Sequence, residues 1–168
     1  MHMQTLNDLF EHEIADLYSA ETQLVEALPK LAQAATHDEL KTAFQHHLDE
    51  TRDHVRRLEE IRGQIGSSMN ETCDGMKGLI SEGEETIEAN GDSTVKDAAL
   101  IAAAQRVEHY EIAAYGTART LAGELGLDDA RDLLNQTLDE EANADTLLTK
   151  IATGGAFKAG VNEQAKTA

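Results

Sequence analysis

The sequence predicts an all-α protein, a bundle of four long helices, and three observations support this fold class. Four long segments repeat apolar residues every three or four positions, which is the spacing of one helix face. Ala and Leu supply most of the 40% hydrophobic residues, there is one Pro and no Trp, and few segments alternate as strands do. Finally, two pairs of periodic segments are each joined by a short turn, and one long connector separates the pairs.

The first predicted helix covers residues 5–33. Thr5 and Asp8 give it a start like a capping box, although Asp stands in place of the usual Glu or Gln. Pro29 is expected to kink or end the helix near its last turns, because proline lacks a backbone N–H and clashes with the preceding turn.

The second predicted helix covers residues 37–64. Thr36 and Glu39 give its start signal, and Gly63 and Gly66 are expected to stop it. The turn that separates it from the first helix is very short. Because such a link places two helices antiparallel, these two are predicted to form a hairpin.

Residues 65–92 are predicted to be a long crossover that contains a short amphipathic helix. Gly, Ser and Asn residues interrupt the periodic pattern here. The apolar positions of the short helix are Met76, Leu79, Ile80 and Ile87. This is more apolar surface than a solvated link needs, so we expect a homodimer or larger assembly, unless the helix simply covers the bundle.

A second hairpin is predicted from helices at 94–123 and 128–153. Two hairpins joined by one long crossover is the connectivity of ferritin-like four-helix bundles. We therefore predict a single bundle domain at residues 1–153. Residues 154–168 begin with Gly-Gly and lack a strong apolar stripe, so they are expected to form a loose tail.

The charge of the chain excludes some classes of partner. The formal net charge is −18, from 14 basic and 32 acidic residues, so nucleic acid and anionic membranes are not expected to bind. The same charge would suit a salt-rich cytoplasm or a surface that gathers cations. No apolar run approaches a membrane span and no export signal is visible. The lone Cys73, interpreted as a surface thiol, indicates a reducing compartment, so we expect a cytoplasmic protein.

Four glutamates fall at one level of the predicted bundle. Glu21 and Glu50 lie 14 and 15 residues from the first turn, and Glu111 and Glu140 lie 15 and 14 residues from the second. A shift of 90 residues places the first pair on the second, which suggests related halves. Each glutamate interrupts an apolar stripe. Any single Glu could lie on a solvated face, but four buried carboxylates at one level would need neutralisation, cations or metal.

The spacing around these residues resembles a metal site but departs from the usual pattern. Di-iron bundles supply one Glu from each of two helices and Glu-x-x-His from the other two. Here His54 follows Glu50 by four positions, and Asn143 stands where a second His would be. Glu108 and Glu111 form Glu-x-x-Glu. His54 is the best nitrogen ligand, or else a hydrogen-bonded core residue, and the second metal position is expected to be weak or open.

Two tyrosines lie one turn from a central glutamate. Tyr18 and Tyr115 are either site residues or core aromatics whose hydroxyls bond a carboxylate. The remaining histidines considered have no convincing partner set and are interpreted as surface or hydrogen-bonding residues; they are His12, His37, His46 and His109.

Several stretches resemble the YciE/YciF family of ferritin-like stress proteins. They are the segments 12–21, 27–30, 47–51, 103–112, 115–117 and 138–141 with Asp145, and the resemblance covers about residues 5–152. It implies a ferritin-like domain, a dinuclear metal centre, frequent dimers and a link to stress responses. Carried over residue by residue, it implies metal positions at Glu21, Glu50, His54, Glu108, Glu111, Glu140, Glu141 and Asp145. Asn143 departs from the broader ferritin pattern, which counts against full ferroxidase activity.

Three functions remain open from the sequence. The first is redox chemistry, in which a di-iron or di-manganese centre reacts with peroxide or oxygen, as in a peroxidase or ferroxidase. The second is binding of divalent metal ions without turnover. The third is a metal-free structural stress protein that buries its acids with Arg, Lys or water and dimerises. Cage storage of iron is a weaker fourth. Oxygen-rich sites accept several metals, so the pattern does not choose between iron and manganese.

Overall fold

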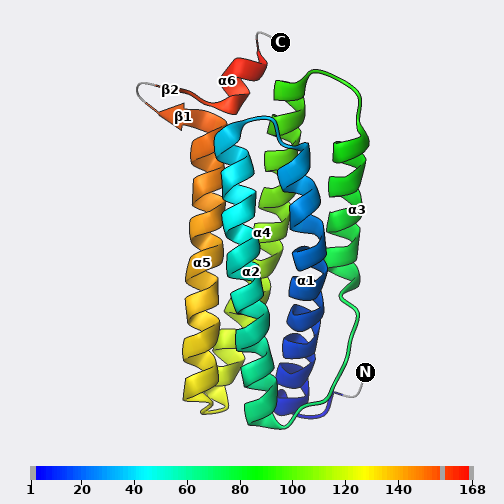
Figure 1. The fold of residues 1–168 in the computed structure, drawn as a ribbon. Coiled ribbons are helices and arrows are strands. Elements are labelled where there is room, and N and C mark those ends of the chain that lie inside the picture. Colours follow the sequence, from blue (N-terminus) through cyan, green and yellow to red (C-terminus); the bar gives the residue numbers. More distant parts are fainter. Residues whose placement is uncertain (1–2, 156–157, 167–168) are drawn as a thin grey trace.

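The computed structural model describes residues 3–155 and 158–166, and it confirms the all-α prediction (Figure 1). Five helices make up most of the described chain, and four of them form the bundle. A two-residue strand pair and a short helix follow. The elements are α1 (Leu6–Ala34), α2 (Asp38–Ile65), α3 (Asp74–Glu88), α4 (Ser93–Glu124), α5 (Asp128–Thr153), β1 (Gly154–Gly155), β2 (Lys158–Ala159) and α6 (Val161–Ala165).

The connectivity is the predicted one, two antiparallel hairpins joined by a crossover. Figure 1 shows α1 and α2 side by side, α4 and α5 side by side, and α3 covering the outside of α1 and α4. The crossover returns the chain to the end of the bundle where α2 begins, so α2 and α4 run in the same direction. Across the bundle, α1 packs on α4 and α2 packs on α5.

The helix ends show which start signals the chain uses. Thr5 and Asp8 form the predicted capping box. Gly66, with φ 66°, ends α2 in the left-handed conformation that glycine adopts at low cost. Pro29 does not end the first helix, which continues to Ala34.

The turn between α1 and α2 is held by a residue of α4 and not by its own sequence signal. Buried Asp97 accepts hydrogen bonds from the backbone amides of Thr36 and His37, each at 2.8 Å, and from the Thr36 hydroxyl at 2.6 Å. Thr36 was expected to cap α2. Its hydroxyl instead donates to Asp97, and the N-cap residue His37 makes no side-chain cap bond. The Asp97 carboxylate therefore satisfies backbone donors that would otherwise be orphaned.

The core consists of two apolar clusters with a polar layer between them. One cluster contains Leu24, Leu28, Leu40, Phe44, Leu100 and Leu148, and the other contains Phe10, Ile14, Leu17, Leu58, Ile61, Tyr115 and Leu134. Along α1 the side chains at 10, 14 and 17 belong to one cluster and those at 24, 28 and 31 to the other. Buried Glu21 lies between them. The polar layer is thus enclosed by hydrocarbon on both sides, which strengthens every electrostatic interaction within it.

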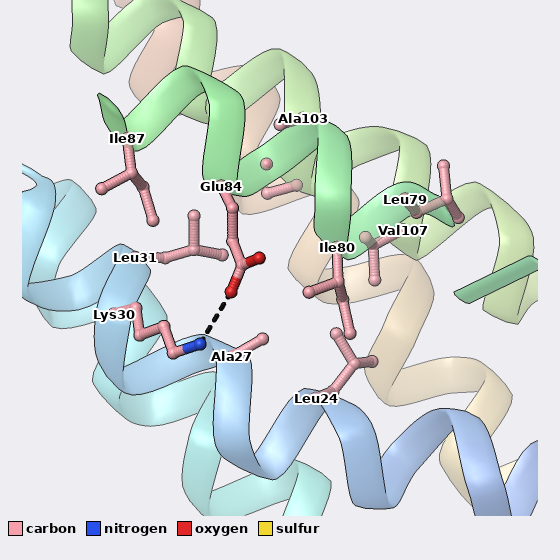
Figure 2. A pocket seen from close by; sticks show the side chains of 12 residues that line it. Leu24, Ala27, Lys30, Leu31, Leu79, Ile80, Glu84, Ile87, Ala103 and Val107 are labelled. Carbon is pink, nitrogen blue, oxygen red and sulfur yellow. Dashed lines mark hydrogen bonds and ion pairs between the residues drawn. The ribbon is translucent and has the colours of Figure 1, made fainter. Parts of the chain in front are cut away.

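The apolar face of α3 packs against its own chain. Met76 is fully buried, and Leu79, Ile80 and Ile87 pack on the core. Figure 2 shows Ile80 and Ile87 of α3 facing Leu24 and Leu31 of α1, and the Lys30–Glu84 ion pair, at 2.7 Å, lies beside them. Of the two possibilities that the sequence left open, this helix covers the bundle. It therefore gives no argument for a dimer.

Cys73 is not the surface thiol that we expected. It is fully buried and caps the N-terminus of α3, where its Sγ accepts a hydrogen bond from the amide of Met76 at 3.3 Å. The Tyr110 hydroxyl lies 2.9 Å from Sγ and also donates to Asp16 at 2.8 Å. The thiol therefore anchors the start of α3 on α1 and α4. Burial, first, and the neighbouring Asp16 raise the pKa of Cys73.

The segment 154–168 was expected to be a loose tail, but its described residues are structured. Gly154–Gly155 pairs antiparallel with Lys158–Ala159, and α6 packs on α4 and α5. Val161 is fully buried, and Lys158 forms an ion pair with Glu39. Residues 156–157 and 167–168 lie outside the described part. Among the described helices, none is both long and apolar enough to cross a membrane.

Candidate metal centre

Six buried ionisable side chains form the polar layer, and we call them the central cluster. All four bundle helices contribute. The members are Glu21 from α1, His47 and His54 from α2, Glu108 and Glu111 from α4, and Glu141 from α5. Glu21, His54, Glu111 and Glu141 have no exposed surface.

The helix period explains why these residues meet. His47 and His54 are seven residues apart, close to two helical turns, so both project from the same face of α2. Glu108 and Glu111 are three residues apart, which also places them on one face of α4. Because each of these faces continues into apolar residues above and below, packing of the hydrophobic clusters turns the ionisable side chains inward.

The cluster divides into two ligand sets that share one residue. Ligand atoms of His47, Glu108, Glu111 and Glu141 all lie within 4.8 Å of one another, and so do those of Glu21, His54 and Glu141. Only Glu141 belongs to both sets. A carboxylate with two oxygens can bridge two cations, so the arrangement has the form of a dinuclear site with Glu141 between the two positions.

The two histidines form ion pairs with the carboxylates of the cluster. His54 Nδ1 lies 2.9 Å from Glu141 Oε1 and 3.3 Å from Glu21 Oε1. His47 Nε2 lies 3.3 Å from Glu108 Oε1 and 3.7 Å from Glu141 Oε2. Burial alone would lower the pKa of each imidazole, but the neighbouring carboxylates raise both pKa values to about 10.

Glu141 responds to the same two contacts. Burial alone would raise its pKa, but the charge of His47 and the hydrogen bond and charge of His54 lower the pKa to about 2. In the metal-free protein at neutral pH, Glu141 is therefore a carboxylate held between two imidazolium ions.

The other carboxylates are not balanced in this way. Burial, then the charges of Glu141 and Glu21, raise the pKa of Glu111 well above its usual range. Burial also raises the pKa of Glu108, against the charge of His47. Within the described part of the chain, both oxygens of Glu111 and one oxygen each of Glu21 and Glu108 are buried without a hydrogen-bond donor, and so are both oxygens of Glu141, despite its two imidazole neighbours. Orphaned acceptors of this kind cost free energy in a metal-free protein, and bound cations would satisfy them.

The donor set fits iron or manganese. Four carboxylates and two imidazoles provide the oxygen and nitrogen ligands that these ions accept. A partner also orients one carboxylate, because the Tyr115 hydroxyl donates to Glu21 Oε1 at 2.5 Å. This is the hydrogen-bonded core aromatic that the sequence offered as an alternative for Tyr115. Tyr18 is not part of the cluster, since its hydroxyl donates to Glu59 at 3.1 Å.

The structure brings five of the eight residues proposed from the sequence into the cluster and leaves three outside it. Those inside are Glu21, His54, Glu108, Glu111 and Glu141, and those outside are Glu50, Glu140 and Asp145. The ligand assignment itself stays a proposal for all of them. Asp145 is partly buried and accepts a hydrogen bond from Gln105 at 2.9 Å.

Glu50 and Glu140 occupy equivalent positions, and both lie outside the cluster. Their side chains keep 27% and 24% of their surface exposed, which places them at the rim of the layer. Glu50 lies near His46 and His47, at 3.2 and 3.6 Å. Glu140 accepts two hydrogen bonds from Arg57. The shift of 90 residues therefore paired two glutamates that occupy equivalent positions in the bundle. Both lie at the rim of the polar layer and not inside it.

His47 is the cluster member that the sequence analysis missed. It lies in one of the stretches that resemble the family, but it was not among the expected metal positions. The available signal was the seven-residue spacing between His47 and His54, which places both imidazoles on one face. The Glu-x-x-His pattern does not include His47, because that pattern places a histidine after Glu50 and not before it.

Fold and cluster together define a ferritin-like bundle with a buried layer of carboxylates and imidazoles. The family model described as "Domain of unknown function (DUF892)" matches residues 5–165. The chain is 45% identical to Protein YciF of Escherichia coli strain K12, over 97% of this chain and 99% of that protein. It belongs to the YciE/YciF family.

Solved structures agree with this assignment. The crystal structure of the Escherichia coli stress protein YciF matches with a TM-score of 0.82 and 47% identity, over 88% of this chain and 94% of that chain. YcfI from Rhodopseudomonas palustris matches with a TM-score of 0.85 and 43% identity, over 89% and 96%. A protein from Xanthomonas campestris, 16% identical with a TM-score of 0.70 over 87% and 89%, shares the fold.

Proposed function

We propose that this chain is a stress-response protein whose central cluster holds two iron or manganese ions and reacts with peroxide or oxygen. The observation that supports this proposal is the pair of ligand sets that share Glu141. When bound, such a centre supplies two electrons in single-electron steps, which matches the reduction of a peroxide O–O bond. The relative named a stress protein, YciF of Escherichia coli, agrees with a protective role.

The residues of the chain have separate tasks in this proposal. Glu141 would be a ligand of both metal ions, while His47, Glu108 and Glu111 would hold one ion and Glu21 and His54 would hold the other. The Tyr115 hydroxyl holds Glu21 in a fixed orientation. The apolar clusters on both sides keep bulk water out of the layer, which strengthens the carboxylate–cation attraction.

One observation favours a second candidate, a metal-free structural protein that acts as a homodimer. His54 and His47 already pair with Glu141 and Glu108, so part of the negative charge is compensated without metal. The four orphaned carboxylate oxygens on Glu21, Glu108 and Glu111 favour the metal-binding candidate, because imidazolium ions do not satisfy them.

Elemental analysis tests the proposal directly. The protein is purified without chelator and without added metal, and we expect about two ions of iron or manganese per chain. The loaded protein is then mixed with hydrogen peroxide, and loss of peroxide is followed against chelator-treated protein. Absence of stoichiometric metal after incubation with either ion would rule out the metal centre. Stable metal without peroxide loss or oxygen uptake would leave metal binding without turnover.

A further inference from the structure

A pocket between α2 and α5 reaches the central cluster from the surface. Two buried cluster members, His47 and Glu108, form part of its lining, and the exposed residues His46 and Asn143 line it as well. Its volume of 90 Å³ has room for several water molecules. The pocket is therefore a route from solvent to ligands that are otherwise enclosed.

The walls of this pocket are apolar and continue into a second groove. Phe44, Ala144 and Leu148 line the pocket. A neighbouring groove on the same two helices shares Ala43, His46 and Leu147 with it and extends to Ile151. We call these two connected features the α2–α5 groove. Leu147, which lines both parts, is 42% exposed, unusual for a large hydrophobic residue in this chain.

The charged and imidazole side chains of the groove lie at its buried end and along its rim. His47 and Glu108 lie at the buried end, where Glu108 Oε2 and both nitrogens of His47 have no hydrogen-bond partner. Asp38, Glu39, Glu50 and His46 lie along the rim. Among them, Glu39 is already paired with Lys158. Apart from Thr42 and Asn143, the rest of the lining is apolar.

This distribution selects the chemistry of a ligand. A polar group is needed at the buried end and an apolar body along the wall. An anionic ligand is disfavoured, because the rim is acidic and the chain carries a net charge of −18. A hydrated cation gains nothing from the apolar wall. An uncharged molecule with a hydrocarbon body and one hydrogen-bonding end meets all of these conditions.

We propose that the α2–α5 groove binds a small uncharged organic hydroperoxide, with the hydroperoxyl group toward Glu108 and His47 and the hydrocarbon part against Ala144 and Leu147. The choice of a hydroperoxide rests on the proposed function. Reduction of ROOH breaks the O–O bond, consumes two electrons and two protons, and leaves ROH and water. The electrons are those that the dinuclear centre supplies, and the protons come from solvent.

The first test measures binding alone and needs no metal. Cumyl alcohol, the product of cumene hydroperoxide reduction, is added to the full-length protein, and saturation-transfer NMR detects contact. We expect binding to the parent and to Ala142→Phe, whose position on α5 is exposed and outside the groove. Binding should be lost in Ala144→Phe, which fills the pocket. An anionic analogue, 2-phenylpropionate, should bind at least about tenfold more weakly.

A second pair of variants guards against misfolding. Leu147→Glu adds a charge to the apolar wall at an exposed position, and Thr146→Glu adds the same charge at its exposed neighbour outside the groove. Only the first should weaken alcohol binding. Equal binding by parent and both groove variants would overturn the inference. So would a solution dimer that Leu147→Glu dissociates, because a second copy would then occupy the groove.

The second test compares two peroxides with the metal-loaded protein. In single-turnover reactions of the reduced, metal-loaded protein, Ala144→Phe should lower the second-order rate constant for cumene hydroperoxide about tenfold and change that for hydrogen peroxide less than about twofold. Equal loss for both peroxides would overturn the inference but leave the proposed function standing. Alcohol binding at the groove without reaction with either peroxide would overturn the proposed function and leave the groove as a binding site for uncharged apolar alcohols.

Discussion

Arg57 holds both carboxylate oxygens of Glu140, with Nη1 2.5 Å from Oε2 and Nη2 3.0 Å from Oε1. His54 Nε2 adds a third contact at 2.9 Å. Burial alone would raise the pKa of Glu140, but the hydrogen bonds from Arg57, Gln136 and His54 and the charge of Arg57 together lower it. The charge of Glu140 is thus satisfied within the protein. The next residue, Glu141, turns about 100° around the helix and faces the cluster.

Adjacent glutamates of α5 should therefore differ in their effect on metal content. We expect Glu141→Gln to lose nearly all bound metal, because both ligand sets include this residue. Glu140→Gln should keep the metal content of the parent and lower the free energy of unfolding by about 1–2 kcal/mol, the cost of weakening a charge-assisted pair. Elemental analysis and chemical denaturation measure the two quantities.

Each variant serves as the control for the other, since both remove one negative charge from neighbouring positions of one helix. A parallel loss of metal in both would show that the rim glutamates also act as ligands. In that case the four-glutamate interpretation of the sequence would be right for Glu140, and it would be wrong to limit the α5 ligands to Glu141.

The difference between Glu140 and Glu141 also shows how far the sequence could lead. Helix positions, hairpins and the crossover followed from apolar period and turn lengths, and the level of the polar layer followed from counting along each helix. The apolar pattern could not predict which of Glu140 and Glu141 faces the interior. Leu133 and Leu138 are only partly buried, so the apolar stripe on α5 is broad. Arg57, which binds Glu140 at the rim, belongs to another helix, and no local sequence signal predicts this contact.

Long-range partners explain the other differences as well. Asp97 replaces the predicted cap at Thr36 from 61 residues away, and Tyr110 and Asp16 enclose Cys73 from two other helices. Local pattern predicts which segments become helices. It does not predict which buried polar group a distant side chain will satisfy.

His47 should support one of the two metal positions. It belongs only to the ligand set with Glu108 and Glu111. We therefore expect the metal content of the His47→Gln variant to be about one ion per chain, compared with about two in the parent. Its neighbour His46, with 68% of its side chain exposed, provides the matched control, and His46→Gln should keep both ions. Equal metal content in the two variants would remove His47 from the ligand assignment.

Glu111 and Glu141 should have opposite effects on the stability of the metal-free protein. Both oxygens of Glu111 lack a hydrogen-bond donor among the described residues, so Glu111→Gln should raise the free energy of unfolding, on the order of 1 kcal/mol. Glu141→Gln should lower it, because two imidazolium ions would lose their shared counterion. Both variants should bind less metal. Urea denaturation of chelator-treated protein gives the comparison. A decrease for Glu111→Gln would favour the structural candidate, in which every cluster acid stabilises the fold.

Asp97 should stabilise the first hairpin through its three hydrogen bonds. Asp97→Ala would leave the amides of Thr36 and His37 without their acceptor, so we expect a loss of about 2–3 kcal/mol in the free energy of unfolding. Asp132→Ala, at a position with 73% of its side chain exposed, should change stability by less than about 0.5 kcal/mol. Thermal denaturation followed by circular dichroism measures both. Similar stability of the two variants would contradict the role assigned to Asp97.

The metal-free protein should lose stability as the pH rises from about 6.5 to about 10. The folded pKa values of His47 and His54 are about 10, above the unfolded value of 6.5. Burial also raises the pKa values of Glu108 and Glu111. The native state therefore binds more protons than the unfolded state, and its stability falls as those protons leave. Glu141 acts in the opposite sense only below pH 4.5, where its depressed pKa of about 2 makes protonation destabilising.

Metal binding should show the opposite dependence. Cations compete with the protons of the same imidazoles and carboxylates, so affinity should rise across the range in which metal-free stability falls. Thermal unfolding of chelator-treated protein and titration with Mn²⁺ at matched pH values measure the two trends. Each kcal/mol lost should lower Tm by roughly 2–4 °C. In His54→Gln the fall in Tm with pH should be shallower, because one of the titrating groups is gone. The Tm of the metal-free parent could instead stay constant or rise between pH 6.5 and 10. That result would show that the cluster does not hold the imidazoles protonated.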